Sequence, residues 1–198
     1  MIDLLIGTSN AGKLREYGEM IGPPFRLLNL RDVGLDSIDL EEPYDTFEEN
    51  ALHKARSFAI ASNRIALADD SGLAVDALGG RPGVYSARYA PGSDADRYNK
   101  LLGELQDVPE AERTARFVCV VAASDPEGDT LSAEGIVEGR IAFAPGPVIN
   151  GFGYDAVFIP QGYDVVFSAL PPAVKNQLSH RGIALRELMK RLERWARS

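Results

Sequence analysis

The stretch that decides the fold reads Ile65-Ala-Leu-Ala-Asp-Asp-Ser-Gly-Leu-Ala-Val-Asp-Ala-Leu-Gly-Gly-Arg-Pro-Gly-Val-Tyr-Ser-Ala-Arg88. An apolar run of strand length ends there in Asp69, Asp70 and Ser71, and the pattern predicts a turn at Gly72. Carboxylates at the end of a buried strand are costly unless they are paired or bound to a metal. Because Asp and Ser are also common in surface turns, the stretch alone favours a turn, and the other motifs decide whether it is a site.

The composition predicts a globular protein with a sizeable core. The chain has 198 residues, of which 45% are hydrophobic, enough for one large domain or two small lobes. We expect a single domain over residues 1–198, without an independent second domain. The 21 Lys and Arg residues against 29 Asp and Glu residues give a net charge of −8, which disfavours nucleic acid as the main partner.

Two further features predict the cellular setting. The single cysteine, Cys119, lies in the apolar run 117–121, so the chain has no internal disulfide and the thiol is expected in the core. No apolar run approaches the length that spans a bilayer, and residues 1–6 are too short and lack the basic flank of a signal peptide. We therefore expect a cytoplasmic protein with no membrane partner.

Strand-like and helix-like segments alternate along the chain. Helical spacing of apolar residues marks the segments 14–21, 46–62, 93–105 and 179–196. Strands are expected at residues 2–6, 25–30, 65–68, 114–123, 131–141 and 165–167. Thr46 is the expected N-cap of the second helix, with Glu49 at the capping-box position. A turn at 125–128 predicts an antiparallel hairpin, so the fold class is α/β, a mixed sheet with flanking helices.

A candidate phosphate loop follows the first strand. Gly7-Thr-Ser-Asn-Ala-Gly-Lys13 matches the start of the G-x-x-x-x-G-K pattern and lies between a strand and a helix. The next residue is Leu14, which lacks the hydroxyl that binds Mg²⁺ in a P-loop. The loop is therefore expected to hold phosphates through backbone N–H groups and Lys13, with any metal ligands elsewhere. By the pattern alone, an ordinary glycine turn with a surface lysine is the simpler interpretation.

Carboxylates are the expected metal ligands, because Mg²⁺ prefers hard oxygen ligands and bridges them to substrate phosphates. The candidates are Asp69, Asp70, Glu41 and Glu42. The two glutamates belong to the acidic linker 36–45, for which a solvated loop is the simpler interpretation.

Two further groups of residues carry functional side chains. Lys175 and Ser179-His-Arg181 place cations near the start of the last helix, where the helix dipole opposes them unless they face an anion or acceptor groups. Gly151-Phe-Gly-Tyr-Asp155 combines glycines that let a ligand approach with a ring and a carboxylate suited to a flat base. Each has a plainer alternative, an exposed arginine in the first case and core packing of the aromatic ring in the second.

Taken together, these motifs resemble one family. The blocks keep one order along almost the whole chain: Thr8-Ser-Asn-Ala-Gly-Lys13, Thr46-Phe-Glu-Glu-Asn-Ala51, Ala68-Asp-Asp-Ser-Gly-Leu73 with Gly83-Val-Tyr-Ser-Ala-Arg88, Gly151-Phe-Gly-Tyr-Asp155, and Lys175 with Ser179-His-Arg-Gly182. They are similar to the inosine/xanthosine triphosphate pyrophosphatases, also called the Ham1-like family. Five ordered blocks are far more specific than any one of them.

The resemblance implies a homodimer whose mixed α/β fold has two lobes around a deep central cleft. It also implies Mg²⁺-dependent hydrolysis of ITP, dITP and XTP to the monophosphate and pyrophosphate. Ser9 stands where many relatives have Gly, and Ala173-Val174 replaces a common acidic pair, but neither departure removes a residue assigned to the chemistry.

The resemblance also assigns residue roles. Asp70 and Lys13 would be catalytic, with Asp70 as proton acceptor and metal ligand. Asp69 would support the metal site, and either Glu41 or Glu42 would complete it. The residues that would hold the triphosphate are Thr8, Ser9, Asn10, Ala11, Gly12 and Lys13. The residues that would contact the rest of the substrate are Ser71, Phe152, Gly153, Tyr154, Asp155, Lys175, His180 and Arg181.

The chemistry of the residues agrees with these roles in outline. Asp70 would activate a water for attack on the α-phosphorus while Lys13 and Mg²⁺ neutralise phosphate oxygens. His180 and Arg181 donate hydrogen bonds, which suits a 6-keto base and opposes the 6-amino group of adenine. The alternatives are an NTPase that releases orthophosphate, against which Leu14 argues, and a nucleotide-binding or sensing protein without catalysis.

Overall fold

The computed structural model describes residues 1–38 and 40–197; Asp39, in the predicted acidic linker, lies outside the described residues. The strands are β1 (Ile2–Ile6), β2 (Phe25–Asn29), β3 (Ile65–Val75), β4 (Thr114–Ser124), β5 (Thr130–Ile141) and β6 (Phe158–Pro160). The α-helices are α1 (Ala11–Met20), α2 (Phe47–Ser62), α3 (Asp94–Glu104), α4 (Pro172–Leu178) and α5 (His180–Trp195). Within the described residues, no helix has the length and apolar character needed to cross a membrane.

The strands form a mixed sheet in the order β2-β1-β3-β4-β5-β6. β1 lies parallel to β2 and to β3, with Leu4 opposite Leu27 on one side and Ile65 on the other. β6 pairs antiparallel with β5, and a short turn joins the neighbouring strands β4 and β5 as in the predicted hairpin. The predicted α/β class with a mixed sheet is confirmed.

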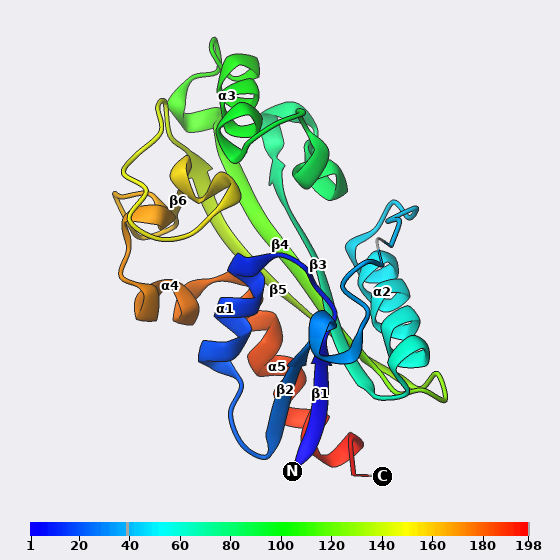
Figure 1. The fold of residues 1–198 in the computed structure, drawn as a ribbon. Helices are drawn as coiled ribbons and strands as arrows, with labels where there is room; N and C mark the ends of the chain where they lie inside the picture. Colours follow the sequence, from blue (N-terminus) through cyan, green and yellow to red (C-terminus); the bar gives the residue numbers. More distant parts are fainter. Residues whose placement is uncertain (39, 198) are drawn as a thin grey trace. The chain divides into compact units, whose positions relative to one another are not determined.

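The chain divides into two compact units, and each unit is made of several separate segments of the sequence. Unit 1 comprises Met1–Asp70, Cys119–Gly135 and Arg181–Ser198, and unit 2 comprises Ser71–Val118 and Ile136–His180. The strands β3, β4 and β5, the long arrows in Figure 1, therefore contribute residues to both units. Each unit has a core of its own, and the organisation as a single domain stays a prediction.

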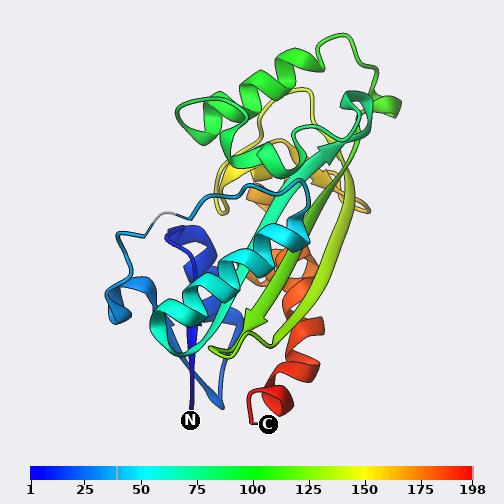
Figure 2. The same cartoon turned by 90° about the vertical axis from the view of Figure 1, so that its right-hand side faces the viewer.

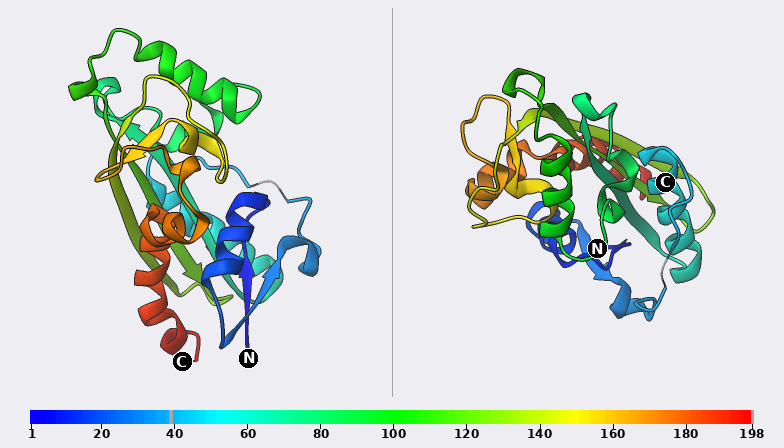
Figure 3. Two further views of the ribbon diagram at one scale, coloured as in Figure 1. Left: turned by 90° about the vertical axis from the view of Figure 1, so that its left-hand side faces the viewer. Right: turned by 90° about the horizontal axis from the view of Figure 1, so that it is seen from above.

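In unit 1 both faces of the sheet are covered, and alternate residues of a strand face different helices. Leu67 of β3 packs with residues of α1 and α5, whereas Ala66 packs with Phe58 of α2. The same alternation holds on β4, where the buried Cys119 packs in the same core as Leu67, whereas Val120 packs with Ala51 and Ala55 of α2. Figure 2 shows α2 along one face of these strands, and the left view of Figure 3 shows α1 and α5 on the other. Burial on both faces explains the near-continuous apolar runs of the sequence.

The core of unit 2 is richer in aromatic side chains. Phe117 of β4, Phe158 of β6 and Phe167 pack against one another with ring centroids 4.6, 5.3 and 6.1 Å apart. Leu101 of α3 and Leu105, which follows that helix, are fully buried against this core. The buried side predicted for the helix after residue 93 is confirmed at these two leucines.

The predicted helix starts are confirmed by their caps. Thr46 Oγ1 accepts a hydrogen bond from Glu49 N at 3.2 Å, which satisfies an N–H group in the first turn of α2. Ser93 and Asp96 form a complete capping box at the start of α3. The short helix α4, which begins at Pro172, is an element that the apolar spacing does not predict.

Two local expectations are wrong. β3 does not end before the two aspartates but continues to Val75, so Gly72 lies inside a strand rather than in a turn. It continues because Leu73 and Val75 are fully buried in a core completed by residues distant in sequence. Residues 165–167 form no strand; Phe167–Ala169 is a 3₁₀ turn that buries the Phe167 ring in the same core.

Candidate active site

The candidate phosphate loop joins β1 to α1 and forms the N-terminal end of that helix. Asn10 caps the helix, because its Oδ1 accepts from Lys13 N at 3.1 Å, and Asn10 N donates to Thr8 Oγ1 at 3.2 Å. Gly7 has to be glycine, since a Cβ there would lie 2.5 Å from a ring carbon of Phe58 on α2. Residues 9–11 are exposed, so the N–H groups of the first turn offer a place for an anion.

β3 directs its two aspartates to opposite faces of the sheet in unit 1. Asp69 lies two residues after Leu67 on the strand, so its side chain faces the same side of the sheet, the side covered by α1 and α5. Asp70 lies two residues after Ala68, so its side chain faces the opposite side of the sheet, which α2 covers. Both aspartates are buried, and Ser71, next on the strand, is partly buried. Two adjacent carboxylates therefore have different partners.

Asp69 lies in a cluster of cations. Its Oδ2 accepts from Lys13 Nζ at 2.9 Å and from Arg181 Nη2 at 3.2 Å. Arg181 is buried as well, and its Nη1 lies 2.5 Å from Glu16 Oε2. Burial raises the pKa of Asp69, but the positive charges of Lys13 and Arg181 outweigh it and hold the pKa well below the ordinary value of 3.8. Asp69 therefore stays ionised and keeps the two cations in place.

Asp70 is held by α2. Asn50 Nδ2 donates to Asp70 Oδ2 at 3.2 Å, and Lys54 Nζ lies 3.5 Å from Oδ1. Burial raises the pKa of Asp70 above 3.8; the charge of Lys54 opposes this, and the charges of Glu42 and Asp69 add to it. Neighbouring carboxyl groups with pKa values shifted in opposite directions are typical of acid–base sites, and the group with the raised pKa is the candidate base.

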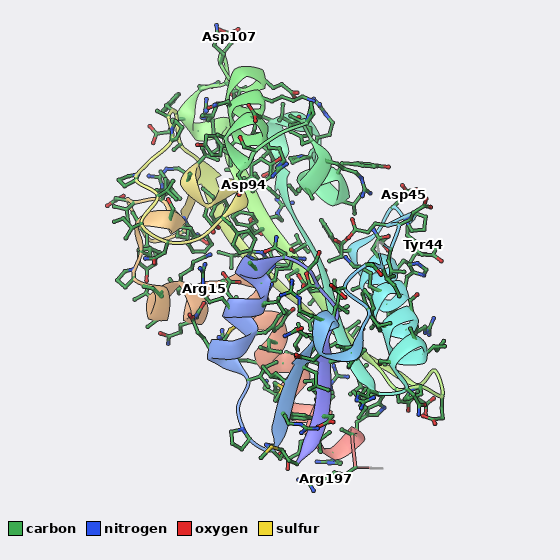
Figure 4. The ribbon with its side chains drawn as sticks, in the orientation of Figure 1. Arg15, Tyr44, Asp45, Asp94, Asp107 and Arg197 are labelled. Atoms are coloured by element: carbon green, nitrogen blue, oxygen red, sulfur yellow. The ribbon has the colours of Figure 1, made fainter. Side chains whose placement is uncertain are left out.

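Sequence reasoning missed two residues of this site, Asn50 and Lys54. Asn50 is fully buried, and besides its bond to Asp70 it accepts from Tyr44 N at 3.1 Å and donates to Tyr44 O at 3.0 Å. Figure 4 labels Tyr44 beside the first turn of α2. Lys54 forms ion pairs with Glu42 and Asp70. The available signal was their spacing, because two polar residues four apart lie on one helix face beside an alanine-rich stripe.

The structure distinguishes the two linker glutamates. Glu42 pairs with Lys54, which also contacts Asp70, whereas Glu41 is exposed. Among residues 1–38 and 40–197, no group of three His, Cys, Asp or Glu side chains is placed to hold a metal ion. Mg²⁺ commonly takes one or two carboxylates together with water and substrate phosphates. Glu42 and Asp70 fit that requirement, because both contact the ammonium of Lys54. Asp69 fits it less well, because its Oδ2 is already shared between Lys13 and Arg181.

The second group of candidate residues lies in unit 2, in the loop 151–155. Asp155 Oδ2 accepts from Phe152 N at 2.9 Å and from Lys175 Nζ at 2.7 Å. The Lys175 ammonium also lies 5.2 Å from the centre of the Phe152 ring. Gly151 has a φ of +91°, and a Cβ there would lie 2.3 Å from Asp155 Oδ2, so both constraints require glycine. The Phe152 ring and the ion pair of Asp155 with Lys175 therefore hold each other in place.

Contacts from other elements of unit 2 hold the backbone of this loop. Gly153 N donates to Asp94 Oδ2 at 2.6 Å, and Asp94 lies in the first turn of α3, where Figure 4 labels it. Arg97 Nη2 donates to the other oxygen of that carboxylate at 2.5 Å. Tyr154 Oη donates to Ser86 O at 3.0 Å. The loop is therefore an ordered platform with a partly exposed aromatic ring.

His180 and Arg181 are neighbours in sequence with different surroundings. His180 stacks on Phe117 in unit 2, with ring centroids 4.6 Å apart and planes 8° from parallel. Arg181 contacts Asp69 and Glu16 in unit 1. Its contact with a base stays a prediction, and the structure adds a second role, that of holding Asp69.

These features define a class of protein. An anion loop between a strand and a helix, buried cations and two carboxyl groups with opposite pKa shifts indicate an enzyme site that binds an anionic substrate and carries out acid–base chemistry. The model of the Ham1 family matches residues 4–191. The chain therefore belongs to the Ham1 family, and the resemblance seen in the sequence is confirmed.

Similar proteins and solved structures agree with this membership. The dITP/XTP pyrophosphatase of Bacillus subtilis (strain 168) is 45% identical over 196 residues, which cover 98% of each chain. The dITP/XTP pyrophosphatase of Nitratidesulfovibrio vulgaris is 48% identical over 199 residues, which cover 94% of each chain. The structure of a HAM1 protein from Coxiella burnetii matches with a TM-score of 0.87 at 37% identity, covering 98% of this chain and 100% of that chain. The predicted α/β fold of this family is confirmed.

Proposed function

We propose that this protein is a pyrophosphohydrolase for non-standard purine nucleotides, which converts ITP, dITP and XTP to the monophosphate and pyrophosphate and so cleanses the nucleotide pool. Family membership supports the proposal, as do the relatives that are dITP/XTP pyrophosphatases. The observation in the site that carries it is the pair Asp69 and Asp70, whose pKa values are shifted in opposite directions.

Asp70 is the proposed general base. A carboxylate with a raised pKa accepts a proton from water more readily than an ordinary aspartate does. As the water oxygen forms a bond to the α-phosphorus, its proton passes to Asp70. The bond from that phosphorus to the bridging oxygen breaks, and pyrophosphate leaves with the bonding electrons. Asn50 orients the base by donating to its Oδ2 at 3.2 Å.

The triphosphate is assigned to the loop from Thr8 to Lys13. Backbone N–H groups at the start of α1 favour negative charge, and Lys13 adds a full positive charge. Because Lys13 Nζ lies 2.9 Å from Asp69, the ammonium is oriented before a phosphate arrives. Asp69 acts through Lys13 and is a positioning residue in this proposal.

Mg²⁺ is the proposed ion in a family that is typically metal-dependent. When bound it would neutralise phosphate oxygens and stabilise the charge that develops on the leaving pyrophosphate. Asp70 and Glu42 are the residues proposed to hold it, because both contact the ammonium of Lys54. Glu41 is the less suitable of the two predicted glutamates because it is exposed.

The purine is assigned to the loop 151–155, together with Lys175, His180 and Arg181. The ring of Phe152 offers a stacking surface that Asp155 and Lys175 keep in place. Donors of His180 and Arg181 suit the 6-keto oxygen of hypoxanthine and xanthine. The 6-amino group of adenine would leave those donors unpaired, which is the proposed basis of selection against ATP.

A panel of ITP, dITP, XTP, GTP and ATP, assayed with and without Mg²⁺, tests the proposal. We expect pyrophosphate and the monophosphate from the first three nucleotides only when Mg²⁺ is present, with ATP turned over at least about a hundredfold more slowly. Orthophosphate without pyrophosphate would instead identify the alternative NTPase. Tight binding of ITP without any turnover would identify a sensing protein.

We also propose that the protein is a homodimer with one domain per chain and that it works in the cytoplasm. The support for the dimer is the family resemblance. Light scattering should give twice the chain mass of 21.5 kDa, and a monomer mass would overturn this part of the proposal. A single cooperative unfolding transition would support one domain, and two separate transitions would contradict it.

A further inference from the structure

A lysine occupies the position between the two carboxylates to which the metal is assigned. Lys54 Nζ pairs with Glu42 Oε1 and lies 3.5 Å from Asp70 Oδ1. Lys54 is only 9% exposed, and it extends from α2, the helix on this face of unit 1. The ammonium is therefore buried between two anionic groups, whereas most lysines extend into solvent.

This placement is costly if Lys54 serves stability alone. Burying an ammonium removes its hydration, and buried ion pairs often fail to recover that cost. The two carboxylates, however, would repel each other without a cation between them, and the buried Asp69 adjacent to Asp70 would add to the repulsion. The group of carboxylates is thus assembled for a cation, and Lys54 supplies one.

We propose that Lys54 is an internal cation that competes with the divalent metal for Glu42 and Asp70. The inference rests on the proposed function, in which these two carboxylates hold the metal. The position between them accepts an ammonium or a divalent ion but not both, because two cations in contact repel strongly in a buried setting. Before the metal binds, Lys54 keeps the ligands in place. When the metal binds, the side chain moves away and is available to a phosphate oxygen of the substrate.

Lys13 provides a matched comparison. It carries the same charge in the same unit, but its partner is Asp69, on the opposite face of β3. Replacing Lys13 lowers the local positive charge and leaves Lys54 between Glu42 and Asp70. A general electrostatic effect is shared by both lysines, whereas direct competition for the metal ligands is specific to Lys54.

The test is Mn²⁺ binding in the absence of nucleotide, followed by electron paramagnetic resonance of the free ion, with displacement by Mg²⁺ to confirm a common site. For Lys54→Gln and Lys54→Met we expect the metal affinity to rise about tenfold or more, because a contacting positive charge has been removed. Lys13→Gln should raise it by no more than about threefold. Lys54→Arg keeps the charge and should leave the affinity within about twofold of the parent protein.

Circular dichroism and thermal unfolding identify the variants that are folded. Two neutral replacements of different chemistry are used, so that the test can still be made if one of them does not fold. Unchanged or weaker metal binding in a folded neutral variant would overturn the proposal. Equal rises for Lys13→Gln and Lys54→Gln would also overturn it, since they would point to general electrostatics.

A second measurement uses the unmodified protein and does not depend on the variants. An amine-reactive reagent followed by mass spectrometry reports how fast Lys54 is labelled. Saturating Mg²⁺ should accelerate the labelling of Lys54 severalfold if the metal displaces its side chain, and leave Lys100 on α3 unchanged. Labelling of Lys54 that is unchanged or slower with Mg²⁺ would contradict displacement.

The outcome is separable from that of the proposed function. If the nucleotide panel yields no pyrophosphate and the neutral Lys54 variants still bind metal more tightly, the competition stands and the reaction is wrong. If pyrophosphate is released and those variants bind metal no better, the reaction stands and the competition is wrong.

Discussion

The two groups of site residues handle charge in different ways. In unit 1 the ion pairs are shared, because Asp69 accepts from two cations and Lys54 contacts two carboxylates. In unit 2 the pair of Asp155 and Lys175 is tied to the backbone through the N–H of Phe152. Shared pairs can exchange partners when a charged ligand arrives, whereas a pair fixed to the backbone keeps its geometry for an uncharged base. Under the proposed function, the ion pairs of Lys54 are therefore the ones that can rearrange, and the pair of Asp155 and Lys175 is the one that stays in place.

Asp70→Asn has the largest expected effect, because it removes the proposed base from the shared network. We expect turnover of ITP, measured as pyrophosphate release, to fall about a thousandfold. Binding of ITP, measured by calorimetry, should be largely kept because the amide has the shape of the carboxylate. Asp45→Asn, an exposed acid labelled in Figure 4 near α2, is the control and should leave turnover unchanged. Unchanged turnover in Asp70→Asn would mean that another group is the base.

Arg181→Ala tests to which of the two groups this arginine belongs. Its removal takes away one of the two cations at Asp69 and the buried ion pair with Glu16, so the free energy of unfolding in urea should fall by about 3 kcal/mol. If Arg181 also contacts the base, the preference for ITP over ATP should erode. The exposed Arg56→Ala is the control and should change neither quantity. Lower stability with an unaltered nucleotide preference would refute the base contact.

Asp69→Asn tests whether the network in unit 1 depends on an ionised carboxylate. The folded-state pKa of Asp69 is lowered below 3.8, so its contribution to stability is fully present above that value and is lost as pH falls through the folded-state pKa. We expect the parent protein to exceed Asp69→Asn in stability at neutral pH, with a gap that narrows as pH falls below about 4. Urea unfolding at a series of pH values measures the gap, and a gap independent of pH would show that the charge does not matter.

Asp94→Ala has the smallest expected effect and probes the fixed loop in unit 2. The N–H of Gly153 loses its acceptor, so the loop gains freedom and KM for ITP should rise about fivefold with little change in kcat. Asp94→Asn keeps an acceptor and should restore KM. Arg97→Ala is the matched control, because it removes the other partner of Asp94 and leaves the bond to Gly153. A loss of kcat with KM unchanged would show that this contact does not position the base.

The elements that depend on local signals could be predicted from the sequence. The starts of α2 and α3 follow from Thr46 and Ser93, whose capping bonds reach only three residues along the chain. The hairpin of β4 and β5 follows from β-branched runs on both sides of a short turn. The sequence places the candidate phosphate loop correctly between β1 and α1 because Gly7 and the helix cap Asn10 lie within one short local motif.

The course of β3 could not be predicted, because its stabilising partners are far away in the chain. Asp69 and Asp70 read as a turn until their ion pairs are known, and Arg181 lies 112 residues from Asp69. Lys54 was missed for the same reason, since its role appears only when α2 is placed beside β3 and the linker with Glu42. The resemblance to a family assigned Asp70 but left Glu41 and Glu42 equivalent, and the fold separates them by exposure.

Hydrolysis of ITP in water enriched in oxygen-18 is the most direct test of the reaction, because the label reports which phosphorus the water attacks. Attack on the α-phosphorus with Asp70 as base predicts that the label enters the monophosphate and that the released pyrophosphate is unlabelled. Label in the pyrophosphate, or in orthophosphate, would contradict this reaction.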